Sequence, residues 1–300
     1  MTKIAFYLIP LVTFLCSCIL AAEPSAAPTL SPGAGSFEFT KNGKTIPVWF
    51  YLPEKHDANT PILFVMHGVK RNGERYRNDW IPHAKKYGVI LLAPEFSEKN
   101  FPGAEFYAYG GAFDSKGHRY PADQWTFSYL EPIFDQVRSA TGTNTATYYL
   151  YGHSAGAQFV HRYLYFVPKA RVAKVVAANA GWWTVPDESV KFPYGLNGSG
   201  LSQESVKLTL QAPLVVLLGT ADTDPNHPEL RRTPEAEAQG PYRLARGKFF
   251  YAAAQKEAQA LGVPLRWTIA YAPGIAHEDK GMAKFAVEWL FGAEKEGKRK

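Results

Sequence analysis

Residues 152–156 read GHSAG, a spacing in which a serine hydroxyl can act as a nucleophile. The run 145–151 before them is rich in aromatic and β-branched residues, which predicts a buried strand. Residues 157–164 have helix-compatible spacing. A strand, a tight turn and a helix would lift the hydroxyl of Ser154 to the end of a sheet, with glycines where neighbouring backbones approach closely. The alternative interpretation is an ordinary turn in which this serine caps the helix.

A nucleophilic serine needs a base that accepts its proton and an acid that orients the base. Asp222 follows the apolar run 213–218, a predicted strand, and so lies at the strand end where parallel sheets build their sites. His277 lies in a loop of small residues after a second predicted strand, 265–271. The order Ser154, Asp222, His277 along the chain therefore predicts a catalytic triad for acyl transfer.

Asp224 is a competing candidate for the acid of this triad. We favour Asp222 because it lies nearer the end of the predicted strand. Asp222, Asp224 and Asn226 also have the opening spacing of an EF-hand calcium loop, but His227 stands where glycine is required and Thr233 where a bidentate glutamate is required. The sequence therefore predicts no metal site here.

Two backbone N–H groups are expected to face the negative charge that develops on the substrate carbonyl. The amide of Ala155, directly after the nucleophile, is one predicted donor. The other is the amide of Val69, in the loop after the predicted strand 62–66, where Gly68 lets the chain turn. We interpret His67 as a structural hydrogen-bonding residue rather than a general base.

Together these motifs resemble the α/β-hydrolases, and among them the branch of secreted esterases that contains poly(3-hydroxybutyrate) depolymerases and feruloyl esterases. The resemblance spans residues 36–292 and is carried by the pair at 67–68, the turn at Ser154 and the stretches 219–222 and 274–277. It implies a carboxylic ester hydrolase that uses no metal or organic cofactor. Depolymerases of this kind often carry a cysteine after the His-Gly pair, where this chain has Val69.

The wider chain supports an α/β class, the α/β-hydrolase fold with a mostly parallel central sheet and helices on both faces. Residues 35–39 and 45–51 are predicted to form an antiparallel N-terminal hairpin, because Asn42-Gly43 between them is a strong type I′ turn signal. The predicted helices are 78–87, 124–140, 155–166, 234–261 and 281–291.

The N-terminus, residues 1–22, is predicted to be a signal peptide, with a basic start and the apolar run Ile4 to Leu15, too short to span a bilayer. Residues 15–18 read LCSC and resemble a bacterial lipobox, in which case Cys18 would carry lipid and attach the protein to a membrane. Release after Ala22 is the alternative. In either case we expect an exported protein, periplasmic, extracellular or membrane-anchored.

Residues 23–35 form a predicted Pro/Ala/Ser-rich tether, 36–292 the catalytic domain, and 293–300 a charged tail. The formal net charge of +6 falls by one when Lys3 leaves with the leader, and the tail indicates a solvated end rather than a nucleic-acid contact. Both cysteines lie in the leader, so the folded domain has no disulfide and no cysteine ligand for a metal.

The substrate must be inferred from the loops. Trp182, just beyond a predicted strand end near Ala180, and His153, beside the nucleophile, are the predicted substrate-binding residues; the alternatives are that Trp182 packs under a loop and that His153 is structural. An aromatic loop at 101–125 suits aryl, sugar and polyester esters, and short-chain esters are a further candidate substrate class. A serine peptidase and a non-catalytic binding lipoprotein remain alternative functions, and the sequence does not indicate an oligomeric state.

Overall fold

The computed structural model describes residues 28–292 of the chain. The predicted signal peptide with Cys18, residues 23–27 of the tether and the charged tail lie outside these residues. Eight strands form one sheet in the order β1-β2-β4-β3-β5-β6-β7-β8. The strands are β1 (Gly33–Lys41), β2 (Lys44–Leu52), β3 (Ile62–Met66), β4 (Ile90–Pro94), β5 (Tyr148–His153), β6 (Val172–Ala178), β7 (Leu214–Gly219) and β8 (Thr268–Ala272).

The sheet is mostly parallel, as the sequence predicts. β2 pairs antiparallel with β1 and with β4, whereas every pair from β4 through β3 and β5 to β8 is parallel. The strands β3, β4 and β7 are buried along their whole length, which is why their sequences are continuous apolar runs rather than alternating ones. Asn42 and Gly43 both have positive φ, 51° and 70°, as the predicted I′ hairpin turn requires.

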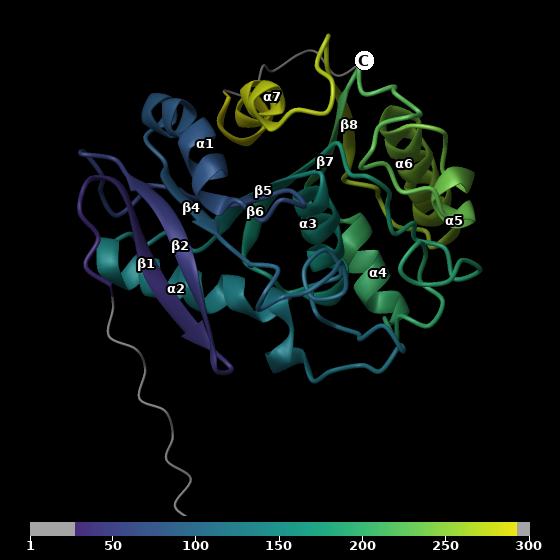
Figure 1. Cartoon of the computed structure of the whole chain (residues 1–300), viewed down its shortest axis with the longest axis horizontal. Coiled ribbons are helices and arrows are strands. Elements are labelled where there is room, and N and C mark those ends of the chain that lie inside the picture. Colours follow the sequence, from purple (N-terminus) through teal and green to yellow (C-terminus); the bar gives the residue numbers. More distant parts are fainter. Residues whose placement is uncertain (1–27, 293–300) are drawn as a thin grey trace, which may run out of the picture.

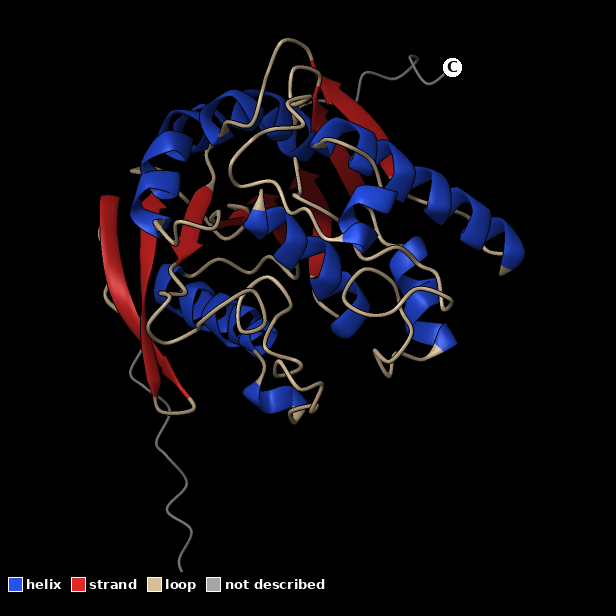
Figure 2. Cartoon of the chain, turned by 45° about the vertical axis from the view of Figure 1, so that its right-hand side comes forward, coloured by secondary structure: helices blue, strands red, loops and turns tan. Residues whose placement is uncertain are grey.

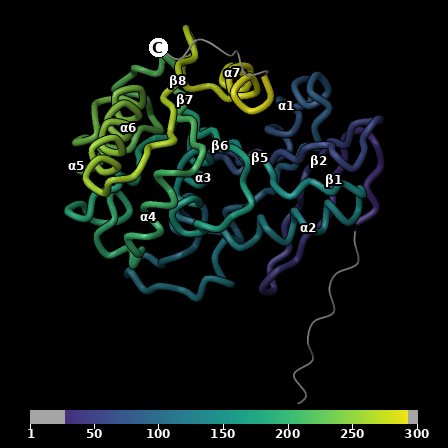
Figure 3. The backbone as a smooth tube through the Cα atoms, turned by 180° about the vertical axis from the view of Figure 1, so that it is seen from behind, coloured from purple at the N-terminus to yellow at the C-terminus, as the bar shows by residue number. Residues whose placement is uncertain are grey.

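Helices cover both faces of the sheet (Figures 1 and 2). On one face α1 and α7 enclose an apolar cluster that includes Trp80, Met282 and Leu290, and on the other α2, α3, α4 and α6 enclose a larger cluster that includes Phe134 and Phe159. The β1–β2 hairpin and the α5–α6 pair lie at opposite ends of the molecule (Figure 3). The helices are α1 (Gly73–Tyr87), η1 (Ala122–Gln124), η2 (Thr126–Tyr129), α2 (Leu130–Thr141), α3 (Ala155–Phe166), α4 (Gln203–Leu210), α5 (Pro234–Ala238), α6 (Arg243–Ala260) and α7 (Asp279–Phe291).

Two predicted helices are interrupted. The predicted helix 234–261 is divided into α5 and α6, because Gly240, with φ of 140°, and the proline after it cannot continue a helix. The predicted helix 124–140 is α2 preceded by two short 3₁₀ turns, because Trp125 has extended backbone and is buried, with its indole N–H donating to the Tyr120 carbonyl at 2.7 Å.

Other boundaries are displaced by contacts that are remote in sequence. α1 begins at Gly73, five residues before the predicted start, where the Gly73 amide donates to the Glu95 carboxylate at 2.8 Å. The last strand begins at Thr268 instead of residue 265, because Arg266 and Trp267 donate hydrogen bonds to the end of α4. β1 begins at Gly33, so it takes in three residues predicted to belong to the tether. The strand β4 and the helix α4 were not predicted.

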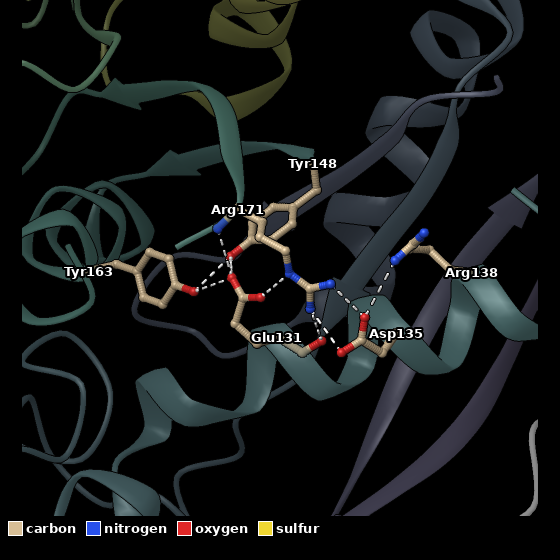
Figure 4. Close-up of polar contacts among 6 residues, drawn as sticks. All are labelled: Glu131, Asp135, Arg138, Tyr148, Tyr163 and Arg171. Atoms are coloured by element: carbon tan, nitrogen blue, oxygen red, sulfur yellow. Dashed lines mark hydrogen bonds and ion pairs between the residues drawn. The ribbon is translucent and has the colours of Figure 1, made fainter. Parts of the chain in front are cut away.

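A polar cluster joins α2 to the sheet (Figure 4). The Glu131 carboxylate accepts hydrogen bonds from the Tyr148 hydroxyl at 2.8 Å and from Arg171 Nε at 2.6 Å. Arg171 also makes a bidentate pair with Asp135 at 2.7 and 2.8 Å. Arg171 directly precedes β6, so these bonds fix α2 against the start of the neighbouring strands β5 and β6. Among residues 28–292, no helix has the length and apolarity needed to cross a membrane.

Candidate active site

The turn between β5 and α3 holds Ser154 in a strained conformation, with φ of 58° and ψ of −116°. The flanking glycines are needed because backbones pass closely on both sides. A Cβ on Gly152 would lie 2.2 Å from the Gly156 carbonyl oxygen, and a Cβ on Gly156 would lie 2.1 Å from the Met66 carbonyl oxygen. A side chain at either position would therefore displace the serine.

Three side chains from separate loops meet at this turn. The Ser154 hydroxyl donates to His277 Nε2 at 3.0 Å, and His277 Nδ1–H donates to Asp222 Oδ2 at 2.9 Å. Asp222 is buried after β7, whereas Asp224 is exposed and accepts from the Asn226 amide. The structure thus brings together the three predicted residues and leaves the competing aspartate out.

The surroundings of His277 favour the neutral form of its imidazole. Burial lowers the pKa of His277, the hydrogen bond to Asp222 opposes this, and the charge of Arg243 lowers the pKa further. His227 packs edge-on against the His277 ring, with ring centroids 5.3 Å apart. A neutral imidazole whose Nδ1–H is bound by a carboxylate presents Nε2 to the serine as a base.

The predicted oxyanion donors flank Ser154. Val69 and Ala155 line one cavity with the serine. Ala155 is the first residue of α3, where helical amides have no partner within the helix, and the Val69 amide donates no hydrogen bond to any residue in the described range. Both amides are thus available to an oxygen placed beside the serine.

His67 fixes the loop that carries Val69. The side chain is fully buried, accepts from the Phe96 amide at Nε2 and contacts the Gly68 carbonyl through Nδ1, each at 3.0 Å. Its ring stacks on Tyr107 at 4.5 Å, and burial lowers the pKa of His67 to about 3. The geometry agrees with a structural role, as predicted, because neither ring nitrogen faces the serine.

The cavity beside Ser154 has a volume of about 370 Å³ and is rich in arginine. Arg71, Arg231 and Arg243 line it, together with the acids Glu98 and Glu229. Arg71 is paired with Glu98 at 3.0 Å, whereas no carboxylate in the described range lies within ion-pair distance of Arg231. Within residues 28–292, no three His, Cys, Asp or Glu side chains are grouped as metal ligands would be.

The two predicted substrate-binding residues are placed differently. Trp182 lines the cavity but is 2% exposed, with Arg162 over its ring at 4.3 Å and Arg231 at 5.4 Å. Its ring is thus packed against two cations rather than open for stacking. His153 does not line the cavity: it is buried behind His277, with ring centroids 4.8 Å apart, and shares a hydrogen bond with the Tyr76 hydroxyl. The interpretation of His153 as a supporting residue fits this position better than substrate contact.

Comparison with known proteins shows the superfamily of this chain. No protein-family model matched the chain, and a search of curated proteins returned no match. Among solved structures, the chain is similar to poly(aspartic acid) hydrolase-1 from Sphingomonas sp. KT-1, with 50% identity over 86% of this chain and 98% of that one and a TM-score of 0.85. The chain belongs to the α/β-hydrolase superfamily.

Two further structures extend the comparison for this α/β-hydrolase. LpqC, a poly(3-hydroxybutyrate) depolymerase from Bordetella parapertussis, is 35% identical over 87% of this chain and 90% of that one, with a TM-score of 0.83. This likeness confirms the predicted resemblance to depolymerases. An S-formylglutathione hydrolase from Agrobacterium tumefaciens, 14% identical over 87% of this chain and 95% of that one, shares the fold with a TM-score of 0.55.

Two residues that organise the site of this α/β-hydrolase were not singled out from the sequence. Arg243, the first residue of α6, lies 3.4 Å from Asp222 Oδ1. Asn179, buried after β6, accepts from the Gly219 amide at 2.8 Å and donates to the Ala276 carbonyl at 3.0 Å. Both act through contacts between separate loops, and no local motif marks them. The one available signal for Asn179 was its position at the predicted strand end near Ala180.

Proposed function

We propose that this protein is an exported serine hydrolase that cleaves carboxylic esters through an acyl-enzyme. The observation that carries the proposal is the continuous hydrogen-bonded chain from Ser154 through His277 to Asp222, which opens on a cavity beside two available amides. A serine hydroxyl alone is a weak nucleophile, and this arrangement supplies the base, its orienting acid and the oxyanion donors.

The reaction follows from the roles of these groups. His277 Nε2 takes the proton of Ser154 as its Oγ attacks the ester carbonyl, and Asp222 stabilises the imidazolium that forms. The amides of Val69 and Ala155 stabilise the oxyanion. His277 then gives its proton to the leaving alcohol, which leaves the acyl group on Ser154. Water attacks this acyl group while His277 takes its proton, and His277 then returns that proton to Ser154 Oγ as the bond to the acyl group breaks and the acid is released.

A second candidate function is hydrolysis of the amide bonds of an anionic polymer, since the same triad also cleaves amides. Arg231 favours an acidic substrate, because it lines the cavity, is exposed and has no carboxylate of the described residues within ion-pair distance. The 50% identity to a protein named for its action on poly(aspartic acid) favours the same class of substrate. A second cavity of about 390 Å³ shares Arg231 with the first and is lined by Lys116 and Lys191 together with Glu105 and Asp114. Two adjoining cavities would accommodate several units of a chain.

Export is part of the proposal because of the leader at residues 1–22 and the lipobox-like stretch that ends at Cys18. Mass spectrometry of the mature N-terminus after expression in a bacterial host tests it. An acylated Cys18 supports a membrane-anchored enzyme, and a chain that begins at Glu23 supports a soluble exported one. A mature protein that retains Met1 would overturn export.

The catalytic proposal is tested with Ser154→Ala. We expect the variant to fold as the wild type does and to lose turnover of p-nitrophenyl butyrate by roughly a thousandfold or more. Ser202→Ala, which removes a hydroxyl that caps α4, is the matched control and should retain activity. Undiminished hydrolysis by purified Ser154→Ala would refute the nucleophile. A fluorophosphonate that fails to label the wild type would instead favour a binding protein.

Assays of wild type on butyryl, feruloyl and poly(3-hydroxybutyrate) esters and on poly(aspartic acid) separate the two candidate substrates. Higher kcat/KM on esters supports ester hydrolysis. Higher kcat/KM on poly(aspartic acid) would favour the amide alternative.

A further inference from the structure

The acid of the proposed triad has a buried cation as its second partner. Asp222 is 3% exposed and uses Oδ2 for His277, while its Oδ1 lies 3.4 Å from Arg243 Nη1. Arg243 is itself 1% exposed and donates through Nη2 to His227 Nδ1 at 3.2 Å. One guanidinium therefore connects the triad acid to the histidine that packs on the triad base.

Burial of the Arg243 guanidinium has a free-energy cost that its contacts must offset. A guanidinium removed from water must be compensated by hydrogen bonds or by an opposite charge, and Arg243 Nε has no hydrogen-bond partner among the described residues. Burial lowers the pKa of Arg243, and the charge of Asp222 opposes this. The arginine thus depends on Asp222 for compensation. In return its Nη1, held in place because Nη2 bonds His227, restricts the rotation of the carboxylate.

The same cation acts on His277. The charged and titratable groups that face the imidazole are Asp222 and His227 from the loop after β7, Arg243 from α6, and His153 from the end of β5. Burial lowers the pKa of His153 strongly, so that ring is neutral and adds no charge. Arg243 is therefore the permanent positive charge that opposes protonation of His277, and it partly offsets the attraction of Asp222.

We propose that Arg243 is a positioning residue for the proposed reaction: its guanidinium holds the Asp222 carboxylate toward His277 and places a fixed positive charge beside that pair. The inference rests on the proposed function, because it requires His277 to be the base. It adds a fourth side chain to the three that the motifs indicate.

The test measures how fast a fluorophosphonate labels Ser154, by intact-protein mass spectrometry, as a function of pH. This readout needs no knowledge of the natural substrate. For wild type the rate should rise with pH as His277 loses its proton. For Arg243→Gln we expect the midpoint to move upward by about one pH unit. We also expect the plateau rate to fall roughly ten- to a hundredfold, because the carboxylate is less well oriented.

Two variants serve as controls. Arg243→Lys keeps the charge but loses the fork, so its midpoint should stay near that of the wild type while its plateau falls. Arg246→Gln removes a buried arginine from the same helix whose hydrogen bonds go to the carbonyls of Gly181, Arg231 and Gly240, away from the triad. It should lower thermal stability and leave the midpoint unchanged.

The outcomes are distinct. A folded Arg243→Gln with the midpoint and plateau of the wild type would overturn the role of Arg243. If that variant does not fold, Arg243→Lys decides, and a plateau equal to that of the wild type overturns positioning. A midpoint that moves equally in Arg246→Gln would show a non-specific effect and also overturn the proposal. Absence of labelling in the wild type would refute the proposed function itself, independently of Arg243.

Discussion

At the scale of single residues, burial sets the charge state of the ionisable groups around Ser154. His67 and His153 are fully or almost fully enclosed, and burial lowers the pKa of both, so they serve as neutral hydrogen-bonding groups. His277 differs because a carboxylate binds its Nδ1 while Nε2 reaches the serine. These three histidines therefore differ in their capacity for proton transfer. Of the three, only His277 has the geometry of a base.

The two candidate acids should respond unequally to the loss of charge. Asp222→Asn removes the carboxylate that holds His277 Nδ1–H, so we expect kcat/KM on p-nitrophenyl butyrate to fall by roughly a thousandfold or more. Asp224→Asn changes an exposed side chain and should alter it by less than about twofold. The reverse ranking in purified, folded variants would move the acid to Asp224.

Asp279, two residues after His277, is a buried carboxylate that should make stability depend on pH. Tyr151 donates to its Oδ1 at 2.8 Å, its Oδ2 has no partner among the described residues, and burial raises the pKa of Asp279 to about 7. An unfolded aspartate has a pKa of about 3.9, so the folded state binds this proton more tightly. This group's contribution to stability is therefore present below about pH 4 and is lost as pH rises toward 7.

Asp279→Asn removes that titration. We expect the Tm of the variant minus that of the wild type to increase between pH 4 and pH 7 and then to level off, measured by thermal denaturation in low-absorbance buffers. A difference that stays constant over this range would show that Asp279 is ionised in the folded protein throughout.

At the scale of elements, the site depends on loops that follow three parallel strands. β5 delivers Ser154, β7 delivers Asp222 and β8 delivers His277, and these strands end at one edge of the sheet. Asn179, after the intervening strand β6, bonds the β7 end at Gly219 and the histidine loop at Ala276. It thus fixes the distance between the loops that carry the acid and the base.

Loss of the Asn179 side-chain amide should slow the chemical step more than it weakens substrate binding. For Asn179→Ala we expect kcat to fall roughly tenfold or more with KM changed less, because the base is less well placed while the cavity lining remains. Asn59→Ala, at an exposed position before β3, is the matched control and should behave as wild type. A variant with normal kcat would show that the histidine loop is held by other contacts.

At the scale of the whole molecule, charge should influence which substrates reach the site. The chain carries a formal net charge of +6, and the cavity beside Ser154 has three arginines and two glutamates among its lining residues. Attraction between exposed charges extends over about 30 Å at 0.01 M salt and about 3 Å at 1 M. A polyanionic substrate would therefore be attracted mainly at low ionic strength.

This attraction can be measured directly. If the substrate is an anionic chain, kcat/KM on poly(aspartic acid) should fall severalfold between about 0.01 and 0.5 M NaCl. Hydrolysis of neutral p-nitrophenyl butyrate should change little and is the internal control. Equal salt dependence for both substrates would argue against recognition of substrate charge.

Much of the fold was accessible from sequence because its signals are local. Continuous apolar runs predicted β3 and β7, and Asn42-Gly43 predicted the hairpin, since each pattern reflects the burial or backbone geometry of adjacent residues. The boundaries of α1 and β8 were wrong because they depend on hydrogen bonds to Glu95 and α4. The site shows the same difference between local patterns and remote contacts. Local motifs indicated the triad, whereas Arg243 is placed by contacts between separate loops and was not indicated.

The sequence by itself determined the mostly parallel α/β architecture and the positions of Ser154, Asp222 and His277 along the chain, because strand ends and a glycine-flanked turn are written in consecutive residues. Only the tertiary structure decided that Asp222 rather than Asp224 lies against His277, that Trp182 is packed against two arginines, and that His153 is behind the base. These outcomes depend on distances between loops far apart in the chain, and such distances are set by packing of the whole sheet rather than by any local pattern.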